Sequence, residues 1–305
     1  MIDDLPVRTG YSDATDVRIY YEDLGDPAAP PLLLIMGFSA QLTAWPDDFC
    51  RLLVAAGYRV IRFDNRDIGL SGRLKGVRAE GNTFLNVARF WTLGRPGNAP
   101  YLLTDMAADT VGVLDHLGIE SAHVVGASMG GMIAQIVAGK HPSRVRSLGL
   151  VFTSTNEPFL PPPSPRCLNG LFGGPGANAT REQRIQFSVD FLRTISGSKY
   201  RIPDGELRAE AEVAYERGYY PAGIIRQLAA TLATGSLAGF ARQVECPTVV
   251  LHGTDDPLVR PQGGAAVAKA IKHAKFFRIE GWGHNLPAEL QPYLAGLLTT
   301  NAVSA

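Results

Sequence analysis

Short runs of apolar and β-branched residues alternate along the chain with segments whose apolar positions recur at helical spacing. The runs predict strands beginning near Val17, Pro31, Tyr58, His123, Ser147, Thr248 and Lys275. The helical spacing predicts helices near 45–56, 103–117, 129–140 and 287–298. Strands that alternate with helices in this way are typical of an α/β fold, with a mostly parallel central sheet flanked by helices.

The alternation stops between residues 154 and 241. This segment opens with two stretches rich in Pro and Gly, PFLPPPSPR and LFGGPGAN, which predict irregular loops. Helical stretches follow from Arg181, Glu206 and Pro221, the last with Pro at a favoured first helical position. We expect a helical cap (lid) domain at 154–241, inserted after the sixth strand over the carboxyl edge of the sheet. Residues 1–153 and 242–305 then form the core domain.

One turn between a predicted strand and a predicted helix reads GASMGG at residues 126–131. Small residues let the strand and the helix approach closely, and such a turn presents its serine hydroxyl at the sheet edge, before a helix N-terminus. The G-x-S-x-G motif alone is weak evidence, because a serine there could serve only as the N-cap of the helix. Its place directly after a strand favours the stronger interpretation, in which Ser128 is a nucleophile.

A serine nucleophile needs a general base, and the base needs an acid that orients it. One later strand ends at the turn GTDDP, which carries Asp256, and the next ends at GWGH, which carries His284. Open parallel sheets carry their sites where strands end in this way, at the carboxyl edge. The order of nucleophile, acid and base along the chain predicts a catalytic triad of Ser128, Asp256 and His284.

Two other carboxylates compete for the role of the acid. Asp255 is adjacent to Asp256 in the same turn, and Glu157 follows the preceding strand. Adjacent side chains point in different directions, so only one residue of the pair can face His284 well. Among the remaining histidines, His252 ends a strand and is expected to pack inside the protein.

The composition changes this picture little. Lys and Arg together number 29, as do Asp and Glu, so nothing suggests a nucleic acid or an anionic membrane as partner. The three cysteines lie far apart without C-x-x-C spacing and are expected to be reduced thiols. The start MIDDLPVRTG has no apolar signal region, and no apolar run approaches the roughly 18 residues of a membrane span. We therefore expect a cytoplasmic protein.

At the triad motifs the chain resembles the α/β-hydrolase superfamily, over nearly its whole length outside the cap. The stretch FDNRDIGLS at 63–71 resembles the D-x-R-G-x-G-x-S loop of the family's esterases, with Asp67 where the family has Gly. That loop is usually structural, so the resemblance implies no catalytic role for Arg66. The family pattern H-G-x-x-D, laid on residues 252–256, selects Asp256 over Asp255 as the acid.

The loop after the strand that ends near Met36 reads Met-Gly-Phe-Ser, where family members often carry His-Gly. This replacement resembles the subgroup of esterases around aclacinomycin methylesterase. An oxyanion hole needs N–H groups and not a particular side chain, so the departure leaves it intact. By resemblance the donors are the backbone N–H groups of Phe38 and Met129, although Phe38 could also be only a rim aromatic.

These residues predict acyl transfer from a small-molecule carboxylic ester, of the methyl or short-chain type, to water. The chemistry needs no metal or organic cofactor. Hydrolysis of enol-lactones or of carbon–carbon bonds uses the same triad, and a non-catalytic ligand receptor on this fold is the alternative from another class. The cap is expected to line a mostly apolar pocket above Ser128, with Phe159, Leu160 and Phe172 as candidate lining residues.

Overall fold

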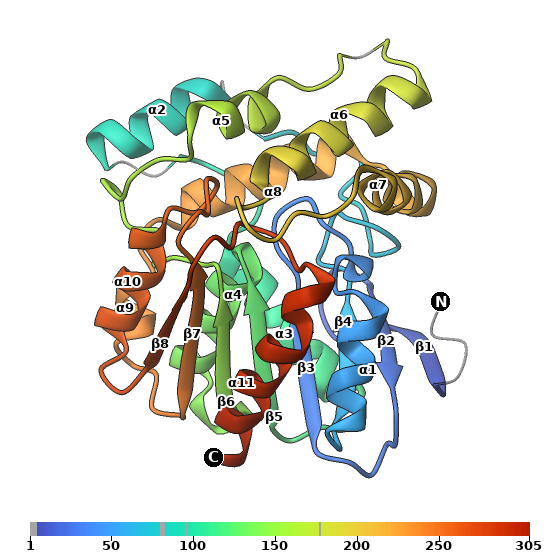
Figure 1. Ribbon diagram of the computed structural model, residues 1–305, viewed down its shortest axis with the longest axis vertical. Helices are drawn as coiled ribbons and strands as arrows, with labels where there is room; N and C mark the ends of the chain where they lie inside the picture. The colour runs from blue at the N-terminus through green and yellow to red at the C-terminus, as the bar shows by residue number, and fades with distance from the viewer. Residues whose placement is uncertain (1–4, 80–82, 95–96, 177) are drawn as a thin grey trace.

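The computed structural model describes residues 5–79, 83–94, 97–176 and 178–305, whose arrangement is shown in Figure 1. Within these residues eight strands form one sheet, in the order β1-β2-β4-β3-β5-β6-β7-β8. The strands are β1 (Val7–Ser12), β2 (Ile19–Leu24), β3 (Pro31–Ile35), β4 (Arg59–Phe63), β5 (Ala122–Ala127), β6 (Val145–Val151), β7 (Thr248–Gly253) and β8 (Lys275–Ile279). The strand β2 runs antiparallel to β1 and β4, and all other neighbouring strands are parallel. The mostly parallel sheet is thus confirmed for the described residues.

Helices cover both faces of the sheet. They are α1 (Asp47–Ala55) and α11 (Gln291–Val303) on one face, and α3 (Leu103–His116), α4 (Met129–Lys140) and α10 (Pro261–Ala270) on the other. Successive side chains of a strand point to opposite faces. In β3, Leu33 and Ile35 accordingly join the core under α3 and α4, while Leu32 and Leu34 join the core under α1. Short 3-10 helices are η1 (Leu42–Ala44), η2 (Pro142–Arg144) and η3 (Ala288–Leu290).

Further helices follow β6 and form a layer above the sheet in Figure 1. They are α5 (Pro165–Phe172), α6 (Arg181–Ile195), α7 (Asp204–Gly218) and α8 (Pro221–Thr234), and α9 (Ala238–Ala241) follows them before β7. Helices α6 and α7 pack on each other through a small apolar cluster around Ile185 and Leu207. By contrast, α9 packs against α4 and α10. The division of the chain into a core and a cap at the predicted boundaries stays a prediction.

A second segment joins this helical layer. Helix α2 (Thr83–Leu93) comes from the connection between β4 and α3 and packs against α8. Val87 and Phe90 of α2 are buried against Leu232 of α8. The sequence pattern did not predict α2. It also missed α5, which begins at Pro165 inside a stretch predicted as loop, and β1, an edge strand with a single buried residue, Ser12.

Two ion pairs tie the inserted helices to the loop at 63–71. Arg226 of α8 donates to both carboxylate oxygens of Asp67 at 2.7 Å, and Arg217 of α7 lies 2.6 Å from Asp64. Asp67 has φ +69°, in the left-handed region that favours glycine. The buried pair with Arg226 compensates this strain, which accounts for Asp where the family pattern has Gly.

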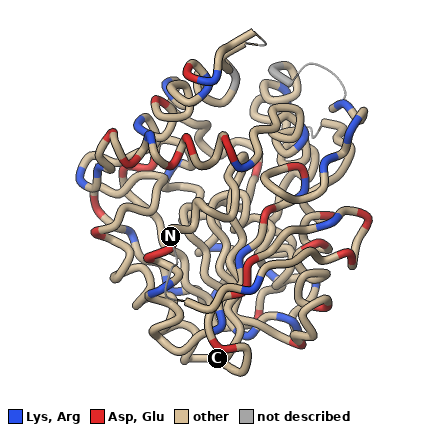
Figure 2. The backbone as a smooth tube through the Cα atoms, turned by 90° about the vertical axis from the view of Figure 1, so that its right-hand side faces the viewer, with Lys and Arg blue, Asp and Glu red and all other residues tan. Residues whose placement is uncertain are grey.

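The charged residues are interspersed over the face that Figure 2 shows, in keeping with the equal totals of 29 for each sign. Helices α6 and α7 carry many of them, because their outer faces meet water. Within the described part of the chain, none of the helices has both the length and the apolar character that crossing a membrane requires.

Candidate active site

Strand β5 passes into α4 through a single residue, Ser128. Its backbone has φ +56° and ψ −122°, a conformation that residues other than glycine rarely adopt. Such strain costs about 1–3 kcal/mol and persists only where the surrounding structure enforces it, commonly at a functional site. Although Ser128 is the N-cap of α4, its side chain makes no capping hydrogen bond. The interpretation of this serine as a mere N-cap therefore loses its support.

Close packing of the backbone enforces the turn. A side chain at Gly130 would collide with the carbonyl of Ile35 at the end of β3. The N–H of Ser128 donates to the carbonyl of Val151 at 3.0 Å, and its carbonyl accepts from Oγ1 of Thr153 at 2.6 Å. The ends of β3, β5 and β6 are thus fixed around Ser128, which is half-buried.

The predicted acid and base form a buried pair at the ends of β7 and β8. Nδ1 of His284 lies 2.7 Å from Oδ2 of Asp256, and both side chains are buried. The other carboxylate oxygen of Asp256 accepts from the N–H groups of Leu258 and Val259, at 2.9 Å each. The N–H of His284 donates to the carbonyl of Ile195 at 2.8 Å, so the end of α6 also holds the histidine loop.

Charge and hydrogen bonding set the protonation of this pair. Burial acts to raise the pKa of Asp256, but the charge of His284 and hydrogen bonds from His284 and His252 keep it below its ordinary value. Asp256 is therefore ionised at neutral pH and accepts a hydrogen bond from the Nδ1–H of His284. This fixes the imidazole with Nε2 unprotonated, which is the form that a general base requires.

A second histidine contacts the same carboxylate. His252 is fully buried, as expected, with Nε2 at 2.8 Å from the carbonyl of Val259 and at 3.4 Å from Oδ2 of Asp256. No pattern in the sequence predicts this contact, although the two residues lie only four positions apart at the end of β7. Its Nε2 donates to the carbonyl and adds positive potential near Asp256.

Phe152 brings the serine turn and the histidine loop together. It follows Val151, whose carbonyl accepts from Ser128, and its ring centroid lies 4.3 Å from that of His284. Its own φ of +36° is a further strained backbone value at the edge of the sheet. The end of β6 therefore adjoins both Ser128 and His284, which places all three predicted triad residues at one edge.

The competing carboxylates lie elsewhere. Asp255 is exposed and accepts from the N–H of Ser198 at 3.3 Å. Hydrogen bonding, first with the side chain of Ser198 and also with Thr254 and this N–H, lowers the pKa of Asp255. Glu157 accepts from Oγ1 of Thr155 at 2.6 Å. Among the contacts of the described residues, Asp256 is the carboxylate that binds His284.

The turn after β3 passes beside Ser128. A Cβ added to Gly37 would lie 2.8 Å from Cβ and 3.3 Å from Oγ of Ser128, so only glycine lets the backbone come this close. Phe38 follows it, half-buried against the core. Met129 is the first residue of α4, where N–H groups have no partner within the helix. The two predicted N–H donors therefore belong to backbone segments on either side of Ser128.

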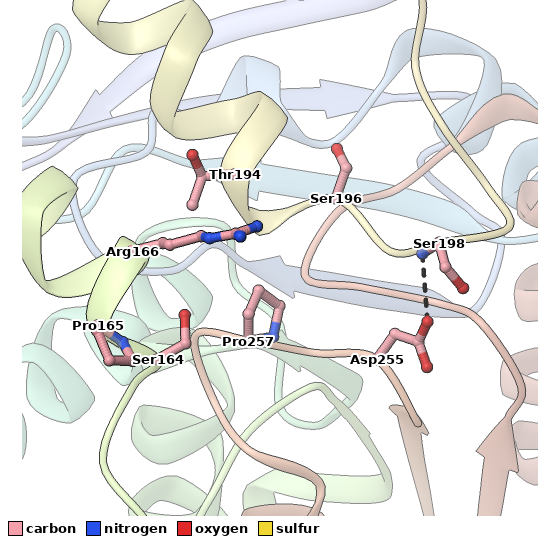
Figure 3. Close-up of a pocket in the computed structure, with 8 residues that line it drawn as sticks. All are labelled: Ser164, Pro165, Arg166, Thr194, Ser196, Ser198, Asp255 and Pro257. Carbon is pink, nitrogen blue, oxygen red and sulfur yellow. Dashed lines mark hydrogen bonds between the residues drawn. The ribbon is translucent and has the colours of Figure 1, made fainter.

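A cavity of about 440 Å³ lies between α5, the end of α6 and the turn that carries Asp255 (Figure 3). Its lining consists of Ser164, Pro165, Arg166, Thr194, Ser196, Ser198, Asp255 and Pro257. Arg166 extends into it from α5, and Asp255 binds the backbone of Ser198 across it (Figure 3). Six of the eight lining residues carry a hydroxyl or a charge, and the sequence pattern did not predict this cavity.

Of the predicted pocket residues, Phe159 and Leu160 are not among those that line this cavity. Phe159 is 70% exposed, with φ +72°, and Leu160 is half-buried. The side chain of Phe172 lies outside the described part of the structure. A role of these three residues in an apolar substrate pocket stays a prediction.

The arginine of the 63–71 loop makes structural contacts. Arg66 is buried and lies 2.6 Å and 2.8 Å from the two carboxylate oxygens of Asp109 in α3. Nothing in this pair faces Ser128 in the described contacts. Over the described ranges, no three His, Cys, Asp or Glu side chains are grouped as metal ligands.

Comparison with known proteins identifies the relatives of this chain. The family described as alpha/beta hydrolase fold matches residues 30–289. The rhodomycin D methylesterase DnrP of Streptomyces peucetius is 29% identical over 319 aligned residues, which cover 99% of each protein. A 2-hydroxy-6-oxononadienedioate/2-hydroxy-6-oxononatrienedioate hydrolase of Cupriavidus pinatubonensis is 28% identical, over 88% of this chain and 85% of its own.

Solved structures share the fold. A 2-hydroxy-6-oxo-6-phenylhexa-2,4-dienoate hydrolase from Rhodococcus sp. strain RHA1 superposes with a TM-score of 0.73. The alignment covers 99% of this chain and 100% of that one, at 17% identity. A likeness at this level of identity concerns the arrangement of strands and helices, which extends over the whole chain.

Proposed function

Because the chain belongs to the alpha/beta hydrolase family, we propose that it is a serine hydrolase that cleaves carboxylic esters. Membership confirms the family and the fold expected from the sequence. Ser128, His284 and Asp256 are the proposed nucleophile, base and acid. The observation that carries these roles is the buried 2.7 Å contact between His284 and Asp256, at the sheet edge where Ser128 is held in a strained turn.

The proposed reaction has two halves. Oγ of Ser128 attacks the ester carbonyl while Nε2 of His284 takes its proton, and Asp256 stabilises the imidazolium. The N–H groups of Phe38 and Met129 bind the oxyanion, where each well-placed donor is worth about 10²–10³ in kcat. His284 then protonates the leaving alcohol. Water, activated by the same histidine, releases the acid from the acyl-enzyme, and no step calls for a cofactor.

The proposed substrate is a methyl or short-chain ester of a small molecule. Support comes from the similarity to a rhodomycin D methylesterase, which extends over 99% of both chains. Enol-lactone and carbon–carbon bond hydrolysis use the same triad, but no contact described above favours them. The cytosolic setting is proposed from the sequence alone.

A kinetic panel that varies the acyl and alcohol parts of the ester separately tests this proposal. We expect turnover of p-nitrophenyl acetate, which is an activated ester, and of methyl esters. Among alkyl esters, kcat/KM should fall as the alcohol part becomes larger. Binding without turnover of any ester would instead favour a ligand receptor. Faster cleavage of an enol-lactone than of every ester would move the proposed substrate to that class.

A further inference from the structure

The buried side-chain amide of Gln227, on α8, lies between the turn after β3 and the loop at 63–71. Its side chain is 0% exposed. Oε1 accepts from the N–H of Ser39 at 3.0 Å, and Nε2 donates to the carbonyl of Arg66 at 3.0 Å. Because a buried polar group is costly to leave unpaired, this amide stabilises one arrangement of the two backbone segments that it joins.

Ser39 is the residue that this amide restrains. It has φ +58°, in a region unfavourable for residues other than glycine, so the turn it occupies needs support from its surroundings. The hydrogen bond from its N–H to Gln227 supplies such support. Phe38, directly before it, carries one of the proposed oxyanion donors. The direction of that N–H depends on the backbone of the same turn.

The other end of the turn is held from the 63–71 loop. Nδ2 of Asn65, which is 1% exposed, donates to the carbonyl of Met36 at 2.8 Å. Asn65 directly precedes Arg66, whose carbonyl Gln227 binds. The two amides therefore fix residues 36–39 at both ends, while Gly37 between them lies against Ser128.

Helix α8 is itself held firmly at this point. Arg226, next to Gln227, makes the bidentate ion pair with Asp67 and donates to the carbonyl of Val77 at 2.7 Å. Gly223, one turn earlier, packs directly against the carbonyl of Asp67. A helix inserted between β6 and β7 thus reaches the turn after β3 through a rigid contact.

We propose that Gln227 is a positioning residue for the oxyanion hole, acting from α8 through Ser39 on the N–H of Phe38. This inference rests on the proposed function. It means that the rate of the chemical step depends on how the inserted helices sit, even where they do not touch the substrate. Gln227 acts through the turn and needs no contact with the reacting atoms.

The test compares Gln227→Met with Thr231→Val. Met fills a similar volume without either hydrogen bond, whereas Thr231 lies one turn further along α8, and its hydroxyl donates to the carbonyl of Gln227. Each kcat for p-nitrophenyl acetate is normalised to active sites titrated with a fluorophosphonate, so that loss of folded protein does not count as loss of rate. Gln227→Asn, one methylene too short to reach both partners, serves as the second variant if the Met variant does not fold.

We expect Gln227→Met to lower kcat by roughly 10–100-fold with little change in KM, less than the about 10²–10³ lost when a donor is removed outright. The inhibition constant of a trifluoromethyl ketone, which forms an oxyanion adduct, should rise by the same factor. Thr231→Val should keep kcat within about twofold, since it leaves the turn intact.

Equal kcat in the Gln227 and Thr231 variants would overturn the inference, as would an inhibition constant that does not follow kcat/KM. Failure of the proposed function looks different. In that case the wild-type protein itself would not hydrolyse the ester or react with the fluorophosphonate.

Discussion

Replacing Asp256 by Asn changes one atom of a group with four contacts. If the amide oxygen keeps the N–H groups of Leu258 and Val259, the amide nitrogen faces Nδ1 of His284, where a carboxylate oxygen lay at 2.7 Å. The amide N–H and an Nδ1–H would both be donors and could not form a hydrogen bond. Nδ1 must therefore accept from the amide, and His284 carries its proton on Nε2. In this tautomer it cannot accept the proton of Ser128. We expect kcat to fall by up to about 10⁴-fold, or about 5 kcal/mol of transition-state stabilisation.

The assay is kcat for p-nitrophenyl acetate, with circular dichroism to show that each variant is folded. Asp255→Asn is the matched control, because Asp255 is the adjacent carboxylate but is exposed and bound to Ser198. Glu157→Gln is a second control, because Glu157 is the competing carboxylate that follows β6. Both controls should keep most activity. A folded but inactive Asp255 or Glu157 variant, beside an active Asp256→Asn protein, would refute this assignment of the acid.

Other parts of the structure give further expectations. The pKa of Asp256 is below its ordinary value of 3.8, so its ionised form stabilises the fold at neutral pH, and this contribution is lost as pH falls below about 3.8. The difference in the free energy of unfolding between wild type and Asp256→Asn, measured by urea unfolding, should therefore be smaller at about pH 3 than at neutral pH. A difference that does not change with pH would contradict this. Asp67→Gly should lower the free energy of unfolding by about 3–5 kcal/mol, because the buried guanidinium of Arg226 loses the carboxylate that neutralises its charge. Adding Arg226→Met should recover much of this loss. If the loss of unfolding free energy in the double variant equals the sum of the losses in the two single variants, measured by urea unfolding, the pair is not coupled. Gly130→Ala should lower the free energy of unfolding by about 1–3 kcal/mol or more, because the added methyl group collides with the carbonyl of Ile35. Gly296→Ala, in open space on α11, should raise it by about 0.5–1 kcal/mol. Equal melting temperatures of the two variants would contradict the packing argument.

Local patterns predicted the parts of the molecule that depend on neighbours in sequence. The bounds of α4 agree with the predicted 129–140, because its apolar residues and glycines follow a buried strand without interruption. The placement of Ser128, Asp256 and His284 at strand ends followed from strand order alone, since parallel strands end at one edge. The strand β1 was missed because its one buried residue is the polar Ser12, so the sequence VRTGYS has little apolar alternation to detect.

Contacts between distant residues could not be predicted in this way. Asp67 looked like a departure from a family pattern until the structure placed Arg226, 159 residues away, against it. The hydrogen bond from Ser39 to Gln227 spans 188 residues, and neither residue carries a local signal for it. The cavity at Asp255 likewise forms between α5, α6 and the turn after β7, and no periodicity in the sequence relates these three segments.

Covalent labelling shows whether Ser128 is an activated nucleophile. The native protein is treated with a fluorophosphonate, and the modified peptide is identified by mass spectrometry. We expect one adduct, on Ser128, and none in a folded Ser128→Ala variant, whose kcat for p-nitrophenyl acetate should be lower by about 10³-fold or more. An adduct on a different serine, or full turnover by Ser128→Ala, would contradict the account.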